Sequence, residues 1–397
     1  MKEIYIGRQP IFDREQNVFG YELLFRRGNS TESQVLDGDE ATKELLLNIF
    51  SYFAFDELVG GKPAFVNFTT NLILNPPPLP PDKVVIEVLE DVLPTQDILD
   101  SLKNLAAQGF TLALDDVVYH EGLKPFFELV NVLKVDLMGT DKALLPEHVK
   151  ILKQYPVKLL AEKVETYEEF EFCKKLGFDL FQGFFLSKPR LFAGKRMQTN
   201  KVVVMNLIAK LQNPSVKINE VELLLSQDPV LSFKLLKIIN SAAYARPTKV
   251  ESLQKAVILL GLKKLKEWVS LIVLTSVDDK PSELIKNTMI RAKMCQLLAI
   301  HQHITGADAY FTTGLFSSLD AIMDQPIQEI LDQLPVQEEI KAAILDHQGQ
   351  IGSTLHYIIE YEKGNWVNIP NTEVDSYRTA YVDSIKWAGQ VYTELKS

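Results

Sequence analysis

The sequence predicts an α/β barrel followed by an all-helical domain. Up to about residue 190, short apolar strand patterns alternate with helical patterns. After about residue 195 the strand-like runs stop, and long amphipathic patterns replace them. A chain of 397 residues is long enough for two separate cores. We therefore expect a barrel domain over residues 1–195 and a helical domain over residues 196–397.

In the first part, the order of predicted strands and helices is typical of a (β/α)8 barrel with one antiparallel strand. Residues 3–7 and 18–26 flank the polar turn at 13–17, which is typical of an antiparallel hairpin. Further strands are predicted at 64–68, 84–90, 110–116, 132–136, 157–164 and 179–185, with helices at 41–59, 95–109 and 166–177 among those between them. About eight strands with interleaved helices are the count expected of a closed (β/α) barrel.

The second part reads as helices only. The apolar spacing predicts helices at 199–212, 218–227, 229–244, 252–277 and 283–304. The Asp-Pro pair at 228–229 and the Arg-Pro pair at 246–247 separate some of them.

Composition excludes several classes of protein. The net charge of −10 argues against a general nucleic-acid surface or an anionic-membrane surface, since both need basic fields. The first residues lack the apolar core of a secretory signal, and the most apolar later run, 268–277, is too short to span a bilayer. Cys173 and Cys295 stand alone, so no disulfide framework is implied. We expect a cytoplasmic protein.

Polar side chains recur at or near the ends of the predicted strands. They are Glu22, Asn67, Glu87, Glu90, Asp115, Asp116, Lys134, Asp136, Glu162, Glu165 and Gln182. The carboxyl ends of barrel strands converge on one face, so these side chains are expected to share one pocket. A single acid at such a position is more often a helix cap or a surface ion pair, and the repetition is what favours a site.

So many carboxylates repel one another unless protons or cations neutralise them. Oxygen ligands without His or Cys favour Mg²⁺, Mn²⁺ or Ca²⁺ over zinc. Several acids allow two ions, an arrangement suited to the attack of water on a phosphodiester. A lysine in the ring can steady or deprotonate that water, and Arg26 is a candidate for clamping a phosphate.

These segments resemble the motifs of the EAL domain, the bacterial cyclic-di-GMP phosphodiesterase and receptor fold. The resembling segments are YELLFR (21–26), VNFT (66–69), EVLE (87–90), LALDD (112–116), LKVD (133–136), AEKVET (161–166) and QGFFLSKP (182–189). The resemblance covers nearly all of residues 1–190, and the order of the motifs makes it specific.

The resemblance implies a role for each residue. Two Mg²⁺ or Mn²⁺ ions would be held by Glu22, Asn67, Glu87, Asp115 and Asp116. Lys134 would activate water with Glu162 assisting, and Arg26 and Gln182 would bind cyclic-di-GMP, which would be hydrolysed to linear pGpG. Supporting roles would fall to Glu90, Asp136 and Glu165.

Two positions and one loop depart from the family pattern. Leu23 replaces the alanine of the name motif, and Lys163 replaces a glycine. The loop at 116–125, DVVYHEGLKP, replaces a Gly- and Ser-rich segment that the family links to dimer contacts and to ordering of the metal site. A homodimer is compatible with the resemblance. A catalytically impaired receptor, or a scaffold acting through the second domain, stays open beside the phosphodiesterase.

The helical part resembles the HDOD domain, a relative of the HD phosphohydrolases. Residues 226–269 and 309–323 carry this likeness, which extends over most of 200–390. HD enzymes need a His-Asp pair, but here His347 follows Asp346, and His301 and His303 lie on different faces of a helix. The resemblance therefore implies a domain without catalysis that binds a protein partner.

Overall fold

The computed structural model describes residues 4–27, 55–188, 199–213, 215–226, 229–240, 250, 252–277, 280–369 and 373–396. The chain forms two compact units. The first comprises Met1–Lys188 with Glu362–Val367, and the second comprises Pro189–Tyr361 with Asn368–Ser397. The domain boundary predicted after residue 195 falls outside the described residues and stays a prediction.

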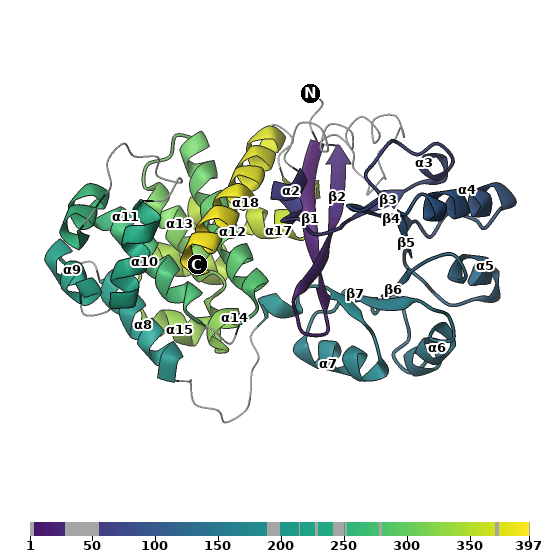
Figure 1. The fold of residues 1–397 in the computed structure, drawn as a ribbon. Coiled ribbons are helices and arrows are strands. Elements are labelled where there is room, and N and C mark those ends of the chain that lie inside the picture. The colour runs from purple at the N-terminus through teal and green to yellow at the C-terminus, as the bar shows by residue number, and fades with distance from the viewer. Residues whose placement is uncertain are drawn as a thin grey trace. The chain divides into compact units, whose positions relative to one another are not determined.

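The first unit is a closed eight-stranded barrel (Figure 1). Its strands are β1 (Ile4–Asp13), β2 (Val18–Arg27), β3 (Ala64–Phe68), β4 (Val84–Val88), β5 (Thr111–Leu114), β6 (Val132–Asp136), β7 (Lys158–Glu162) and β8 (Leu180–Gln182). β1 runs antiparallel to both of its neighbours, β2 and β8, and every other neighbouring pair is parallel. The predicted barrel with one antiparallel strand is thereby confirmed.

The opening hairpin is longer than expected. β1 and β2 each have ten residues, whereas the other strands have three to five. The predicted end of the first strand at residue 7 was wrong, because β1 continues to Asp13. Pro10 does not interrupt it, since pairing with β8 begins only at Ile11, and the missing N–H of Pro10 faces no β8 partner.

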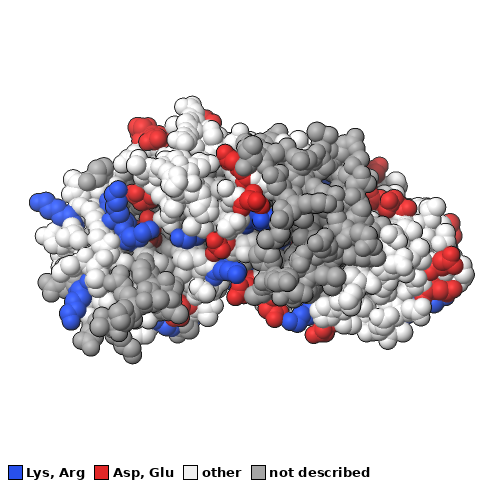
Figure 2. All heavy atoms as spheres, turned by 90° about the horizontal axis from the view of Figure 1, so that it is seen from above, with Lys and Arg blue, Asp and Glu red and all other residues white. Residues whose placement is uncertain are grey.

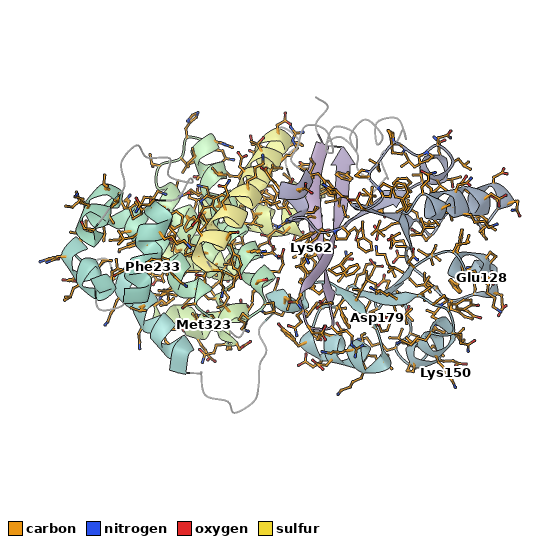
Figure 3. The ribbon with its side chains drawn as sticks, viewed as in Figure 1. Lys62, Glu128, Lys150, Asp179, Phe233 and Met323 are labelled. Carbon is orange, nitrogen blue, oxygen red and sulfur yellow. The ribbon has the colours of Figure 1, made fainter. Side chains whose placement is uncertain are left out.

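Helices cover the outside of the strands (Figure 1). They are α2 (Phe55–Val59), α3 (Thr70–Leu74), α4 (Gln96–Ala107), α5 (Lys124–Phe127), α6 (Leu145–Leu152) and α7 (Tyr167–Leu176), with short 3₁₀ turns η1 (Glu121–Leu123) and η2 (Phe185–Ser187). Residues 41–54 of the predicted helix at 41–59 lie outside the described residues. Figure 3 shows side chains filling the space between the strands, while Glu128 and Lys150 lie on the outer layer.

The second unit is helical, as predicted. Its helices are α8 (Thr199–Gln212), α9 (Ile218–Ser226), α10 (Pro229–Ile239), α11 (Leu253–Thr275), α12 (Ser282–His301), α13 (Ala307–Phe316), α14 (Leu319–Met323), α15 (Ile327–Gln333), α16 (Glu338–Asp346), α17 (Gly349–Glu362) and α18 (Val374–Lys396). α12 packs against α13 and α18, and α11 packs against α8, α9 and α10. Within the described residues, no helix is both long and apolar enough to cross a membrane.

Acidic side chains predominate on part of the barrel surface. Over the barrel helices at the right of Figure 2, acidic side chains (red) predominate over basic ones (blue), in keeping with the net charge of −10. The part of the barrel visible there therefore offers no broad basic field for a nucleic-acid backbone.

Gly183 directly follows β8, at a point where its backbone closely approaches the backbone of Val164. Its φ is +150°, and a Cβ added there would lie 2.1 Å from the carbonyl oxygen of Val164. We predict that Gly183→Ala lowers the free energy of unfolding by about 2–4 kcal/mol, because backbone must move to admit the methyl group. Gly389→Ala on α18, where the space is open, should be neutral or stabilising by up to about 1 kcal/mol. Urea denaturation compares the two, and equal stabilities would contradict this account.

Candidate functional site

The site is the second layer of side chains inside the barrel. The first layer closes the barrel with Ile11, Phe65, Val85, Ala113, Val132, Leu160 and Leu180. Side chains on a strand return to the same face every second residue. Two residues further along each parallel strand, or just beyond its end in the case of β5, lie Asn67, Glu87, Asp115, Lys134, Glu162 and Gln182. An apolar floor therefore carries a polar layer directly above it, at the carboxyl end of the parallel strands.

Lys134 is the centre of this layer. Its ammonium nitrogen lies 2.7 Å from Asp115, 2.8 Å from Glu87, 3.0 Å from Glu162 and 3.5 Å from Glu22. Its side chain is only 1% exposed. Three strands besides β6 thus contribute to one ion cluster, namely β2, β4 and β7, together with the turn directly after β5.

One ammonium cannot neutralise four carboxylates. Burial by itself would lower the pKa of Lys134, but the surrounding carboxylates raise it well above its usual value. Burial raises the pKa of Glu87 well above its usual value, and burial raises that of Glu162 to about 8. Lys134 therefore stays charged, and without a further cation part of the carboxylate ring holds protons at neutral pH.

A turn after β5 brings the adjacent acids Asp115 and Asp116 to the same site. β5 ends at Leu114, so Asp115 and Asp116 lie beyond the strand, and the backbone of Asp116 has a φ of +43°. Asp115, Asp116 and Glu162 each offer a carboxylate oxygen, and these oxygens lie within 4.8 Å of one another. Burial and the charge of Asp115 raise the pKa of Asp116.

The oxygen atoms of the site fit a divalent cation. Asn67 Oδ1, Glu87 Oε2 and Glu162 Oε2 are buried and accept no hydrogen bond. A buried acceptor without a partner is costly, and a cation would satisfy all three. Carboxylate and amide oxygens are the ligands of Mg²⁺ and Mn²⁺. The residues present therefore suit the ions expected from the sequence.

Gln182 and Gln9 complete the layer. Gln182 Nε2 donates to Glu22 Oε2 at 2.6 Å and to Gln9 Oε1 at 3.0 Å. Gln182 Oε1 is buried and has no hydrogen-bond partner. Gln9 was not predicted as a site residue because the first strand was predicted to end at residue 7. Counting back two residues from Ile11, in the antiparallel β1, would have found it.

The remaining predicted residues lie at the margin. Glu90 and Glu165 are exposed, and Glu165 forms an ion pair with Lys188 at 2.9 Å. Arg26 lies on β2 opposite Tyr5, and its side chain lies outside the described residues. None of these three is among the partners of Lys134 given above.

Lys163 places a second ammonium group at the rim of the site. Its ammonium donates to Asp136 Oδ2 at 2.6 Å, which lowers the pKa of Asp136 against the effect of burial. The φ of Lys163 is +54°, in the left-handed region that glycine adopts most easily. The sequence had marked this position only as a replaced glycine.

Two domain families match this chain. The EAL domain family matches residues 56–189, and the HDOD domain family matches residues 197–346. The chain belongs to the family of proteins in which an EAL domain is followed by an HDOD domain.

Two relatives match nearly the whole chain. The protein named "Cyclic di-GMP phosphodiesterase CdgJ" from Vibrio cholerae is 32% identical over 98% of this chain and 94% of its own length. The Bacillus subtilis protein "Uncharacterized protein YuxH" is 32% identical over 97% of this chain and 98% of its own. Among solved structures, a complex of Klebsiella pneumoniae BlrP1 with calcium and cy-diGMP is 24% identical, with a TM-score of 0.39, over 46% of this chain and 55% of its own.

Removing Lys134 should destabilise the barrel. We predict that Lys134→Met, measured without divalent cations at neutral pH, lowers the free energy of unfolding by about 3–5 kcal/mol, because four carboxylates lose their common partner. Excess Mg²⁺ should restore part of the loss. The control Lys83→Met removes an exposed ion pair with Asp56 and should cost less than about 1 kcal/mol. Equal stability of Lys134→Met and the natural protein would contradict the central role of this lysine.

Cation binding should compete with protons. A carboxyl with a raised pKa keeps its proton in the cation-free site, so an incoming cation must displace it. Mn²⁺ affinity should therefore fall as the pH falls below about 8, and calorimetry in buffers of different ionisation enthalpy should detect released protons. Glu162→Gln should release fewer protons than the natural protein. Mn²⁺ affinity that does not change between about pH 6 and about pH 9 would refute this competition.

Proposed function

We propose that the chain is a cyclic-di-GMP phosphodiesterase that hydrolyses its substrate to linear pGpG at a two-cation site in the barrel. The observation that carries the proposal is the ring of buried oxygen ligands around Lys134, at the carboxyl end of the parallel barrel strands. The name of the Vibrio cholerae relative, which matches along the whole chain, supports the same activity.

The cations would be held by oxygen ligands from five positions, Glu22, Asn67, Glu87, Asp115 and Asp116. Mg²⁺ takes six oxygen ligands and keeps some as water, so these side chains suffice for two ions. When bound, the pair would polarise the phosphodiester and make water more acidic.

The chain's own groups would complete the reaction. Lys134 keeps its protons because its pKa is raised, so it would orient the attacking water and stabilise negative charge on the phosphoryl oxygens. The oxygen of water forms a bond to phosphorus while the bond from phosphorus to the ribose 3′ oxygen breaks. The proton of the water passes to a carboxylate, with Glu162 assisting, and the 3′ oxygen takes a proton from solvent. One cyclic dinucleotide and one water thus give one pGpG.

Substrate contacts would come from the upper part of the layer. Gln182 Oε1 is a buried acceptor without a partner, and a guanine N–H would satisfy it. Arg26 would clamp a phosphate.

The HDOD domain would bind a protein partner. The protein would act in the cytoplasm.

A second candidate is a cyclic-di-GMP receptor without turnover. The ion pair of Lys163 with Asp136 favours it, because this ammonium lies beside the acids that hydrolysis would need for a second cation. In that case the nucleotide binds and stays intact.

Chromatography of cyclic-di-GMP incubated with the protein and Mg²⁺ or Mn²⁺ tests the proposal. The natural protein should yield pGpG, and Glu87→Gln should lose about 100-fold or more of the rate, because a buried cation ligand is weakened. Glu168→Gln, an exposed acid on α7, serves as the matched control and should keep full activity. Intact nucleotide that still binds would favour the receptor, and absence of both binding and product would refute both functions.

A further inference from the structure

The hairpin of β1 and β2 forms a wall above the site layer. In its register Gln9 lies opposite Glu22, Gly7 opposite Leu24 and Tyr5 opposite Arg26. Tyr5, Gly7 and Gln9 follow one another at intervals of two on β1, as do Glu22 and Leu24 on β2, so these residues share the face that Glu22 presents to Lys134. The wall therefore continues the inner surface of the barrel past the carboxylate ring.

A segment from far along the sequence is seated on this wall. Glu362–Val367, here called the strap, belongs to the barrel unit, although it begins at the last residue of α17 and is followed by α18 in the sequence. Trp366 is 3% exposed and stacks on Tyr5, with ring centroids 5.3 Å apart and planes 24° apart. A Cβ added to Gly7 would lie 2.7 Å from Trp366 Cζ2, so this glycine leaves the space that the indole fills.

A second contact of the strap supports the same seating. Gly364 has a φ of +78°, and a Cβ added there would lie 3.1 Å from Leu24 Cδ1. Both glycines thus permit close approach between the strap and the wall. The two family matches end at residues 189 and 346, so neither includes the strap.

The strap is also linked to the carboxylate ring by hydrogen bonds. Gln9 Nε2 donates to the carbonyl oxygen of Lys363 at 3.3 Å, which leaves Gln9 Oε1 to accept from Gln182 Nε2 at 3.0 Å. Gln182 Nε2 also donates to Glu22 Oε2 at 2.6 Å. An amide has one donating end and one accepting end, so the strap carbonyl sets the orientation of both glutamines.

We propose that the strap is a positioning element of the barrel site, acting through Gln9 and Gln182 on Glu22. This proposal rests on the proposed function only for the effect of the strap on turnover. The effect of the strap on cation binding can be measured without any reaction. With the strap seated, Glu22 is held by a donor at its Oε2, and Gln182 Oε1 is turned to where a ligand can donate to it. Groups that orient a cation ligand typically change cation affinity 10–100-fold.

The test uses the full chain with Mn²⁺ as the probe. Trp366→Ala should weaken Mn²⁺ binding about tenfold by calorimetry, and Trp366→Phe should recover most of it because a ring still stacks on Tyr5. Trp387→Ala, which removes a ring packed against Trp268 and Phe311 in the second unit, is the matched control and should leave Mn²⁺ affinity unchanged.

A double-mutant cycle separates positioning from simple packing. If the strap acts through Gln9, Gln9→Ala and Trp366→Ala should have less than additive effects on Mn²⁺ affinity. Additive effects, or unchanged affinity in folded Trp366→Ala, would overturn the proposal. Weakened Mn²⁺ binding in a protein that never hydrolyses cyclic-di-GMP would support the strap and refute only the phosphodiesterase.

Discussion

The structure of the site depends on one buried lysine. Lys134 gathers carboxylates from separate elements of the barrel around a single ammonium, with its side chain almost wholly removed from solvent. A charge in such a place is tolerated only with partners, and the partners here exceed it in number. The remaining negative charge suits the layer to binding cations, because protons and divalent cations are two ways to neutralise it. The apolar layer beneath keeps water out and strengthens every one of these interactions.

Much of the barrel could be predicted from the sequence because its strands are short, apolar and end in polar residues. β3 and β6 were predicted to the residue, and the spacing of two residues from floor to site explains why Glu87 and Lys134 could be found without a structure. The same spacing leads from Ala113 to Asp115, whereas the turn that brings Asp116 beside it, with its positive φ at Asp116, is not visible in a strand pattern.

Other features were beyond sequence reasoning for physical reasons. Gln9 was not predicted because Tyr5–Gly7 already satisfies a strand pattern, and the Gln-Pro pair that follows at 9–10 suggests that the strand has ended. Glu165, expected to support the site, lies three positions beyond the last residue of β7, and a strand pattern does not describe its exposure or its ion pair with Lys188. The contact between Gln9 and Lys363 joins residues 354 positions apart, and no local periodicity encodes such a pairing.

Anomalous diffraction from crystals grown with Mn²⁺ and cyclic-di-GMP measures most directly where cations bind. Two manganese peaks within bonding distance of oxygens from Glu22, Asn67, Glu87, Asp115 and Asp116, with cyclic-di-GMP or its product pGpG bound beside them, are the expected result. Manganese absent from this ring while the nucleotide is bound elsewhere on the barrel would contradict it.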